Sequence, residues 1–227
     1  MIVRLLKRLR NWFFRTSTPG LNGLDEKLSK YLDFRNGYFI EAGANDGFSQ
    51  SNTFFLERKR GWRGVLVEGI PELYLKCLEE RRRSIVVNCA LVSDDYLDAT
   101  VVMHYANLMS VVDGSLKTEA EQKRHLQAGV EVQRLSGSYS VEVVARTLES
   151  ILDGIPDIPR IDFLSLDVEG YELSVLKGLN LARYVPKFIL VEARFFNEVD
   201  EYLCAFGYEL VDQLSVHDYL YRHRSWN

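Results

Sequence analysis

The chain has 227 residues, of which 47% are hydrophobic and 26% charged, and its net charge is −4 at pH 7. This length suits one domain with a sizeable core and is too short for two full domains. The charge divides into +5 before Asp25 and −9 after it, which argues against nucleic acid as a partner of the main domain. Cys77, Cys89 and Cys204 lack the spacing of a zinc site or a disulfide framework, so we expect a reducing, cytoplasmic location.

Residues 1–17 are predicted to form a basic amphipathic helix, because apolar residues recur at helical spacing opposite the cations. Charges interrupt the segment before it reaches the apolar length of a signal peptide or a membrane span. Two interpretations stay open: the helix rests on an anionic membrane through its aromatic residues, or it packs on its own domain or a second subunit. Liposome sedimentation with and without the segment would distinguish them. With a linker and a short helix over Leu24–Phe34, this segment forms region 1–36, and the main domain is expected over 37–227.

The apolar run Tyr38–Ala42, which opens onto Gly43, Asn45 and Gly47, predicts a buried strand, a tight turn and a helix. The glycines allow positive φ and a close approach of a ligand to the backbone, and Asn45 tolerates the left-handed region. The third glycine of a dinucleotide fingerprint is missing, and Glu41 would repel phosphate. Because an acid can accept hydrogen bonds from an ammonium group, this loop favours S-adenosylmethionine as the ligand. The residues expected to bind it are Glu41, Gly43, Asn45 and Gly47. An ordinary strand-to-helix turn is the alternative.

Two further strands are predicted to end at the same sheet edge. Gly64–Glu68 ends in a carboxylate roughly twenty residues after the loop, where Glu68 is expected to bind two ribose hydroxyls. Ile85–Leu91 reads as a third strand, and its carboxyl end, with Cys89 and Ala90, is expected near an adenine ring. A plain core strand would show the same pattern.

The helix between these strands is predicted to begin at Pro71, which has the fixed φ of a first helical residue. Its expected buried stripe includes Leu73, Cys77 and Leu78. The arginine run 81–83 suits the carboxyl end of the helix and is interpreted as a solvated terminus.

An insertion over the ligand face is predicted around residues 106–138. Alternating segments over Tyr96–Tyr105 and Tyr139–Val144 indicate paired strands, and Lys117–Gln133 between them is polar and helix-prone. Insertions of this length in compact domains are often lids or recognition loops. Two histidines in or beside the insertion receive no role at this stage, namely His104 and His125.

Acidic residues also end the fourth and fifth predicted strands. The segment Arg160–Gly178 reads as a buried strand ending in Asp167, followed by Glu169 and a helix, and Lys187–Glu192 supplies another strand with a terminal carboxylate. A helix cap would explain Asp167 alone. Acids at four strand ends exceed what capping requires, so we expect a functional site at this edge.

With these blocks the sequence resembles the FkbM family of S-adenosylmethionine-dependent methyltransferases. The resemblance spans roughly residues 37–221 and is carried by the following blocks: Glu41–Gly47, Leu66–Glu68, Asn88–Leu91, Thr147–Leu152, Ile161–Gly178 and Leu190–Glu192. It implies a Rossmann-like class I methyltransferase fold of the α/β class, with a seven-stranded, mostly parallel sheet. It also implies O-methylation of sugar or polyketide-type hydroxyls in glycans and secondary metabolites. Gly69 follows Glu68 where the family pattern suggests proline, which leaves the conformation of that loop open.

The tail fits the antiparallel terminal hairpin of such folds, over Phe206–Leu214 and His217–Tyr221. His217 is a candidate base beside the pocket, and a structural turn is the other reading of this position. Methyl transfer to a hydroxyl needs in-line placement and a nearby base. The candidate bases are Asp167, Glu169 and Glu192, with His217 as a weaker one.

Clustered carboxylates repel each other unless they are protonated, hydrogen-bonded or bridged by a cation. A Mg²⁺ ion held by Asp167 and Glu192 and a carboxylate base acting alone are both left open. A different Rossmann-type nucleotide-dependent enzyme and a non-catalytic, membrane-docked binding module also remain as alternatives. Self-association of the chain is left open as well.

Overall fold

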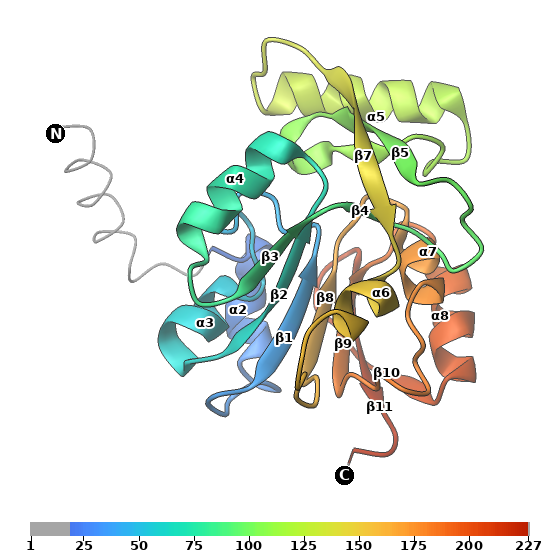
Figure 1. Cartoon of the computed structure of the whole chain (residues 1–227). Coiled ribbons are helices and arrows are strands. Elements are labelled where there is room, and N and C mark those ends of the chain that lie inside the picture. Colours follow the sequence, from blue (N-terminus) through green and yellow to red (C-terminus); the bar gives the residue numbers. More distant parts are fainter. Residues whose placement is uncertain (1–18, 227) are drawn as a thin grey trace, which may run out of the picture.

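The structure, a computed structural model, describes residues 19–226, so the predicted helix over 1–17 lies outside the described residues. Its centre is a seven-stranded sheet in the order β10-β11-β9-β8-β1-β2-β3 (Figure 1). Strand β11 runs opposite to the other six strands, which all share one direction. The strands are β1 Tyr38–Ala42, β2 Arg63–Glu68, β3 Ile85–Asn88, β8 Phe163–Leu166, β9 Phe188–Glu192, β10 Tyr208–Gln213 and β11 Asp218–His223. This topology confirms the predicted α/β fold with its antiparallel carboxyl-terminal hairpin.

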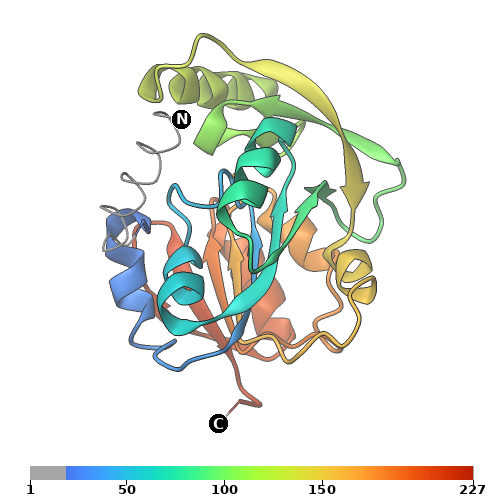
Figure 2. The same cartoon turned by 60° about the vertical axis from the view of Figure 1, so that its left-hand side comes forward.

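Helices cover both faces of the main sheet, as the two views in Figures 1 and 2 show. One face carries the short 3-10 helix η2 Leu21–Gly23 with α2 Leu24–Leu28, α3 Phe54–Arg60 and α4 Pro71–Glu80, and the other carries α6 Leu148–Asp153, α7 Glu172–Lys177 and α8 Phe196–Ala205. Successive strand residues point to opposite faces. In β1, Phe39 therefore packs with α2 and α3, and Ile40 packs with α6, α7 and α8. Burial on both faces explains the continuous apolar runs of these strands.

The insertion forms a small second sheet in the order β4-β7-β5-β6, with a long helix against it. Its elements are β4 Ala90–Leu91, β5 Thr100–Tyr105, η3 Asn107–Met109, β6 Val111–Val112, α5 Glu119–Val132 and β7 Tyr139–Arg146. The predicted pairing of β5 with β7 and the predicted helix between them are confirmed. In Figures 1 and 2, α5 and the small sheet lie beyond the carboxyl ends of the parallel strands.

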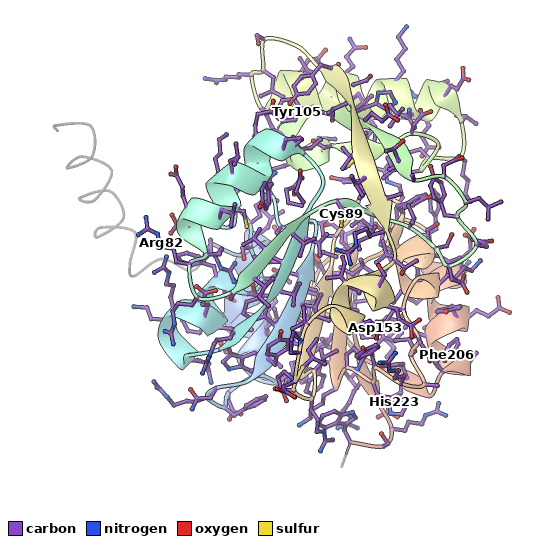
Figure 3. The ribbon with its side chains drawn as sticks, viewed as in Figure 1. Arg82, Cys89, Tyr105, Asp153, Phe206 and His223 are labelled. Carbon is purple, nitrogen blue, oxygen red and sulfur yellow. The ribbon has the colours of Figure 1, made fainter. Side chains whose placement is uncertain are left out.

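The prediction of one continuous strand over Ile85–Leu91 was wrong. The chain leaves the main sheet after Asn88, bends at Cys89, and continues as β4, which pairs with β7 of the small sheet. The Asn88 side-chain amide donates hydrogen bonds to the carbonyls of Glu68 and Gly69, at 2.8 and 2.9 Å, and so ties this bend to the end of β2. Figure 3 shows Cys89 between the two sheets. The predicted helix over Leu24–Phe34 was also too long, since α2 ends at Leu28.

The carboxyl end of α4 differs from the sequence interpretation at two positions. Leu78, expected to be buried, is 40% exposed, because the inward stripe of the helix is completed by Leu73 and Cys77. Arg81, expected to be solvated, is fully buried. Its neighbours Arg82 and Arg83 are exposed as predicted, and Arg82 is labelled at the molecular surface in Figure 3.

The burial of Arg81 has a clear electrostatic reason, because two buried carboxylates pair with it. Arg81 Nε lies 3.1 Å from Glu57 Oε2, and Nη1 lies 3.2 Å from Glu41 Oε2. Nη2 donates to Thr53 Oγ1 at 2.7 Å, and the guanidinium lies 5.2 Å from the centre of the Phe39 ring. A run of three arginines does not reveal from sequence which member turns inward.

None of the helices in the part of the chain that the structure describes is long and apolar enough to cross a membrane.

Candidate functional site

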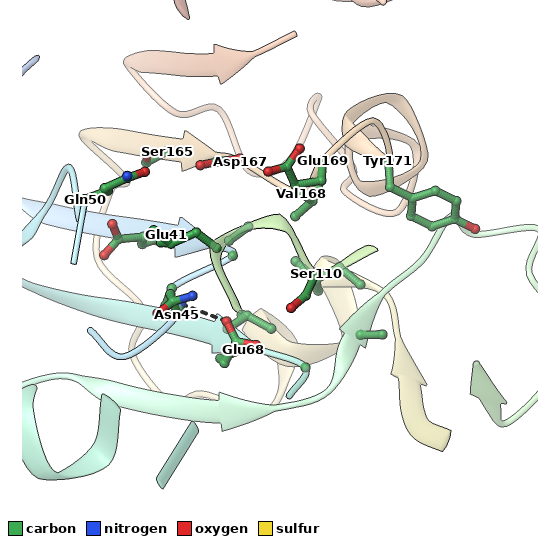
Figure 4. Close-up of a pocket in the computed structure, with 18 of the residues that line it drawn as sticks. Glu41, Asn45, Gln50, Glu68, Ser110, Ser165, Asp167, Val168, Glu169 and Tyr171 are labelled. Atoms are coloured by element: carbon green, nitrogen blue, oxygen red, sulfur yellow. Dashed lines mark hydrogen bonds between the residues drawn. The ribbon is translucent and has the colours of Figure 1, made fainter. Parts of the chain in front are cut away.

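A pocket opens at the carboxyl ends of β1, β2 and β8, under the small sheet and η3 (Figure 4). One side is formed by the turn after β1 and by Glu68, and the opposite side is formed by Asp167, Val168 and Glu169. Cys89 and Ala90 line it at the bend between β3 and β4, and Met103 and Ser110 approach it from the insertion. The predicted meeting of acids from several strand ends is therefore observed at this edge.

Gly43 is required by close packing in the turn. Its φ is +81°, and a Cβ atom at this position would lie 1.8 Å from the carbonyl oxygen of Asp167. The backbone N–H of Gly43 donates to the carbonyl of Val67 at 3.0 Å, so the turn is held between β2 and β8. Only glycine combines this conformation with this approach.

Asn45 and Gly47 occupy different sides of the same turn. Asn45 has the left-handed φ of 49° that its residue type allows, and its backbone N–H donates to Glu68 Oε2 at 2.7 Å. Gly47 also has a positive φ, of 78°, but it lies behind the turn against Cys77 and Arg81 and does not line the pocket. Its carbonyl accepts a hydrogen bond from Arg81.

Glu41 borders the pocket, but its carboxylate already has several partners within the protein. Oε1 accepts from the backbone N–H of Asn52 at 3.0 Å, and Oε2 accepts from Ser51 Oγ and Thr53 Oγ1 at 2.9 and 2.6 Å. Arg81 pairs with the same oxygen. Glu41 therefore holds the segment that leads into α3 against β1, and its predicted contact with a cofactor ammonium stays a prediction.

Glu68 is 6% exposed and organises the loop that follows β2. Its Oε1 accepts from the backbone N–H of Ile70 at 2.8 Å, while Oε2 accepts from Asn45. Burial raises the pKa of Glu68 to about 7. The following Gly69 makes room for the insertion, because a Cβ there would lie 2.2 Å from the sulfur of Met103. A larger residue here would require the Met103 side chain to move.

Cys89 and Ala90 line the pocket where the chain crosses from one sheet to the other. Both are buried, and burial raises the pKa of the Cys89 thiol to about 12, so this wall is uncharged at neutral pH. An uncharged, apolar wall suits the face of a purine ring.

Asp167 and Glu192 form a coupled pair at the ends of β8 and β9. The Asp167 carboxyl is hydrogen-bonded to Glu192, and burial together with the charge of Glu192 raises the pKa of Asp167 well above its usual value. Burial and the nearby Asp218 also raise the pKa of Glu192. Two close carboxyls of this kind disfavour the state in which both are ionised. Asp167 faces the pocket, whereas Glu192 lies behind it.

Glu169 lines the pocket beside Asp167, with an unusual left-handed φ of 54° (Figure 4). Burial and the charge of Glu192 raise its pKa, and Arg194 opposes this rise. His217 is exposed, in the turn before β11, and its side chain does not line the pocket. The structure thus brings Asp167, Glu169 and Glu192 together and leaves His217 outside the pocket.

The sequence match decides which family is concerned. Residues 41–210 match the model of the methyltransferase FkbM domain. The chain belongs to the FkbM methyltransferase family. A curated relative of this FkbM chain, Methyltransferase sdnD of Sordaria araneosa, is 30% identical to it over 167 residues, which is 64% of the chain. The chain covers 61% of the length of that relative.

Solved structures that are similar to this FkbM chain share little of its sequence. A TehB-like SAM-dependent methyltransferase from Corynebacterium glutamicum is 11% identical, with 97% of each chain covered and a TM-score of 0.44. A human methyltransferase 10 domain containing protein is 12% identical, with 90% of this chain and 83% of that chain covered and a TM-score of 0.47. An RNA methyltransferase from Salinibacter ruber with S-adenosyl-L-homocysteine is 10% identical, with 91% and 92% covered and a TM-score of 0.42.

The metal site predicted at Asp167 and Glu192 finds no further ligating side chain in the described part of the chain. Within residues 19–226, no group of three histidine, cysteine or acidic side chains is arranged to hold a metal ion. Asp167 and Glu192 instead satisfy each other through a shared hydrogen bond. The described residues of this FkbM domain therefore give no support to the predicted Mg²⁺ site.

Three residues near the site were missed by the sequence reasoning, namely Arg81, His125 and Arg194. Arg81 was predicted to be exposed to solvent. Arg194 received no role, because it follows a strand whose functional residue was taken to be Glu192. His125 lies in a polar helix with no local partner. Each depends on a neighbour that is distant in the sequence, so no local pattern could have identified it.

Proposed function

We propose that this protein transfers a methyl group from S-adenosylmethionine to a hydroxyl of a sugar, a glycan or a secondary metabolite. The observation that carries the proposal is a single pocket with a glycine turn and Glu68 on one side and the Asp167–Glu169 segment on the other. The first side suits a nucleoside with a cationic amino-acid tail. The second offers carboxyl groups to an acceptor hydroxyl.

The cofactor side fits S-adenosylmethionine group by group. Gly43 lines the pocket, and Glu68 has oxygen lone pairs left for two ribose hydroxyls. Cys89 and Ala90 supply an apolar wall for adenine. When it is bound, the cofactor supplies an electrophilic methyl group. An acid-lined pocket of this kind also disfavours a phosphate-rich acceptor such as nucleic acid.

Asp167 and Glu192 are suited to take the acceptor proton together. Because the Asp167 carboxyl donates to Glu192, its free oxygen can accept the hydroxyl proton while its own proton passes to Glu192. Glu169 beside them can accept a hydrogen bond from a neighbouring hydroxyl of the acceptor. Removing the proton as the methyl group transfers makes a poor nucleophile competent, and no step requires a metal.

Replacing Glu68 with Gln is expected to weaken the binding of S-adenosylmethionine about 10- to 100-fold, since charge-assisted hydrogen bonds contribute ~1.5 to 3 kcal/mol. Calorimetry on the wild type, Glu68→Gln and Glu26→Gln would measure this effect. Glu26 is an exposed acid outside the pocket, so its variant should bind as the wild type does. Unchanged affinity in Glu68→Gln would exclude Glu68 from the site. A melting shift with NAD but not with S-adenosylmethionine would favour a dehydrogenase-type function.

Incubation with methyl-labelled S-adenosylmethionine and panels of glycans and hydroxylated metabolites tests the reaction itself. An O-methyl ether survives mild alkali, whereas a methyl ester does not. We expect alkali-stable label in the product. Alkali-labile label would instead indicate methylation of a carboxyl group.

A further inference from the structure

Helix α5 presents a polar face to the rest of the domain, with Gln122, His125 and Gly129 as its buried residues. Gln122 is fully engaged, because it donates to Asp113 at 2.8 Å and accepts from the backbone N–H of Gly114 at 2.9 Å. Gly129 permits close packing of the helix against η3. His125 is 7% exposed, and neither packing nor a complete set of hydrogen bonds accounts for it.

The partner of one ring nitrogen fixes the proton of His125. Arg194 Nη2 lies 3.1 Å from His125 Nδ1. A guanidinium group can only donate, so Nδ1 must be the acceptor, and the neutral ring carries its proton on Nε2. Burial and the charge of Arg194 lower the pKa of His125 and keep the ring neutral at pH 7, against the opposing effects of Glu121 and the Met109 carbonyl.

The other ring nitrogen faces the pocket carboxylate. His125 Nε2 forms no hydrogen bond of normal geometry, and it lies 3.5 Å from Glu169 Oε2, with the Met109 carbonyl as a second nearby acceptor. This distance exceeds the usual ~2.7 to 3.2 Å of such a bond by only a few tenths of an ångström. Glu169 has a left-handed φ, which costs on the order of 1 to 3 kcal/mol and persists only where surrounding contacts hold it. His125 is the basic side chain of the insertion that is placed to provide such a contact.

Arg194 connects this contact to the strand that carries Glu192. It follows β9 by two residues, donates to His125 through Nη2, and places Nη1 3.8 Å from Glu121 of α5. Lys117, just before α5, forms a second link to the same region, with its Nζ 4.6 Å from the centre of the Phe195 ring. The insertion is therefore anchored beside the Asp167–Glu192 pair.

We propose that His125 is a positioning residue of the active site, whose Nε2–H directs the Glu169 carboxyl group into the pocket for a hydroxyl-bearing acceptor and favours its ionised form. This inference rests on the proposed function for the identity of that acceptor. It makes the insertion a part of the acceptor site, because α5 supplies the group that directs a pocket carboxyl group. The charged groups around His125 are Arg194 after β9, Glu121 on α5 and Glu169 after β8.

Nitrogen-15 spectra of the histidine rings in the intact protein test the first half of this inference without any acceptor. At pH 7, His125 should show a protonated Nε2 and an unprotonated Nδ1. The Nε2 proton should move to lower chemical shift in Glu169→Gln, because an amide oxygen accepts less strongly than a carboxylate. A ring protonated on Nδ1, or a ring signal indifferent to Glu169→Gln, would overturn the proposal.

Carbon-13 titration of the Glu169 carboxyl tests the second half. Loss of a donor to the ionised form raises the pKa of an acid, so His125→Leu should raise that of Glu169 by about one unit. His125→Gln, which keeps a donor, should restore most of the wild-type value. The control Gln127→Leu, on the exposed face of α5, should leave it unchanged. An unaltered Glu169 titration in folded His125→Leu would refute the proposal, and if that variant fails to fold, the ring spectra decide alone.

Calorimetry with S-adenosylmethionine separates this inference from the proposed function. His125→Leu should bind the cofactor as tightly as the wild type does, because His125 does not line the cofactor pocket. A wild type that fails to bind the cofactor would reject the proposed function but would leave the ring and carboxyl measurements valid.

Discussion

Asp167→Asn is expected to lower kcat by a factor of about 10² or more, the contribution of a general base, while the affinity for S-adenosylmethionine survives. The amide keeps the size of the side chain, but it cannot accept a proton from the acceptor and pass another to Glu192. Steady-state kinetics with an identified acceptor and calorimetry with the cofactor would measure the two quantities. Asp33→Asn, at an exposed position outside the pocket, is the matched control.

The stability of the same variant shows whether Asp167 is instead a structural cap. The pKa of Asp167 is raised in the folded protein, so its unfolded form ionises first and the wild type loses stability as pH rises above the ordinary range of an aspartate. Asn removes this loss, so Asp167→Asn should be at least as stable as the wild type at pH 8. A large fall in melting temperature there, with activity lost in proportion, would contradict a role in proton transfer.

Arg81→Met should lower the free energy of unfolding by ~3 to 5 kcal/mol, the usual result of removing one partner from a buried ion pair. The variant leaves Glu41 and Glu57 buried without their shared cation, and it also removes the hydrogen bonds to Gly47 and Thr53. Urea denaturation would measure the change. The matched control is Arg82→Met, which alters the exposed neighbour and should shift stability by about 0.5 kcal/mol or less.

A double variant sharpens this test. The stability lost in Arg81→Met is expected to come from the two carboxylates that are left without a cation. The double variant Arg81→Met/Glu57→Gln should then recover part of the free energy of unfolding, because one of the two buried charges is absent. Additive losses in the double variant would show that the packing of the arginine side chain, and not charge pairing, accounts for the effect.

The alternation of strands and helices was predictable from sequence because it is a local property. Apolar runs that end near Glu41, Glu68, Asp167 and Glu192 indicated the parallel strands and the edge at which the acids meet, but not that β8 would separate β9 from β1. The break at Cys89 was not predictable, since the apolar pattern continues through it and only pairing with β7 removes β4 from the main sheet.

The electrostatic pairing within the site was less accessible from the sequence. Arg81 and Arg82 are the same residue type in one run, and only the three-dimensional positions of Glu41 and Glu57 distinguish them. His125 and Glu169 are 44 positions apart and meet only after α5 docks. The inter-residue contacts that determine ionisation are thus formed by the tertiary fold.

The passage of the chain from β3 through Cys89 into β4 has a consequence for the order in which ligands act. A ligand ring packed on Cys89 and Ala90 would touch the segment in which the chain passes from the main sheet into the small sheet. Ordering this crossing for one ligand lowers the entropy lost when the second ligand arrives, and the linkage is reciprocal. Cooperative binding of donor and acceptor would then need no moving lid, because the segment Asn88–Leu91 connects the main sheet to the small sheet beside the pocket.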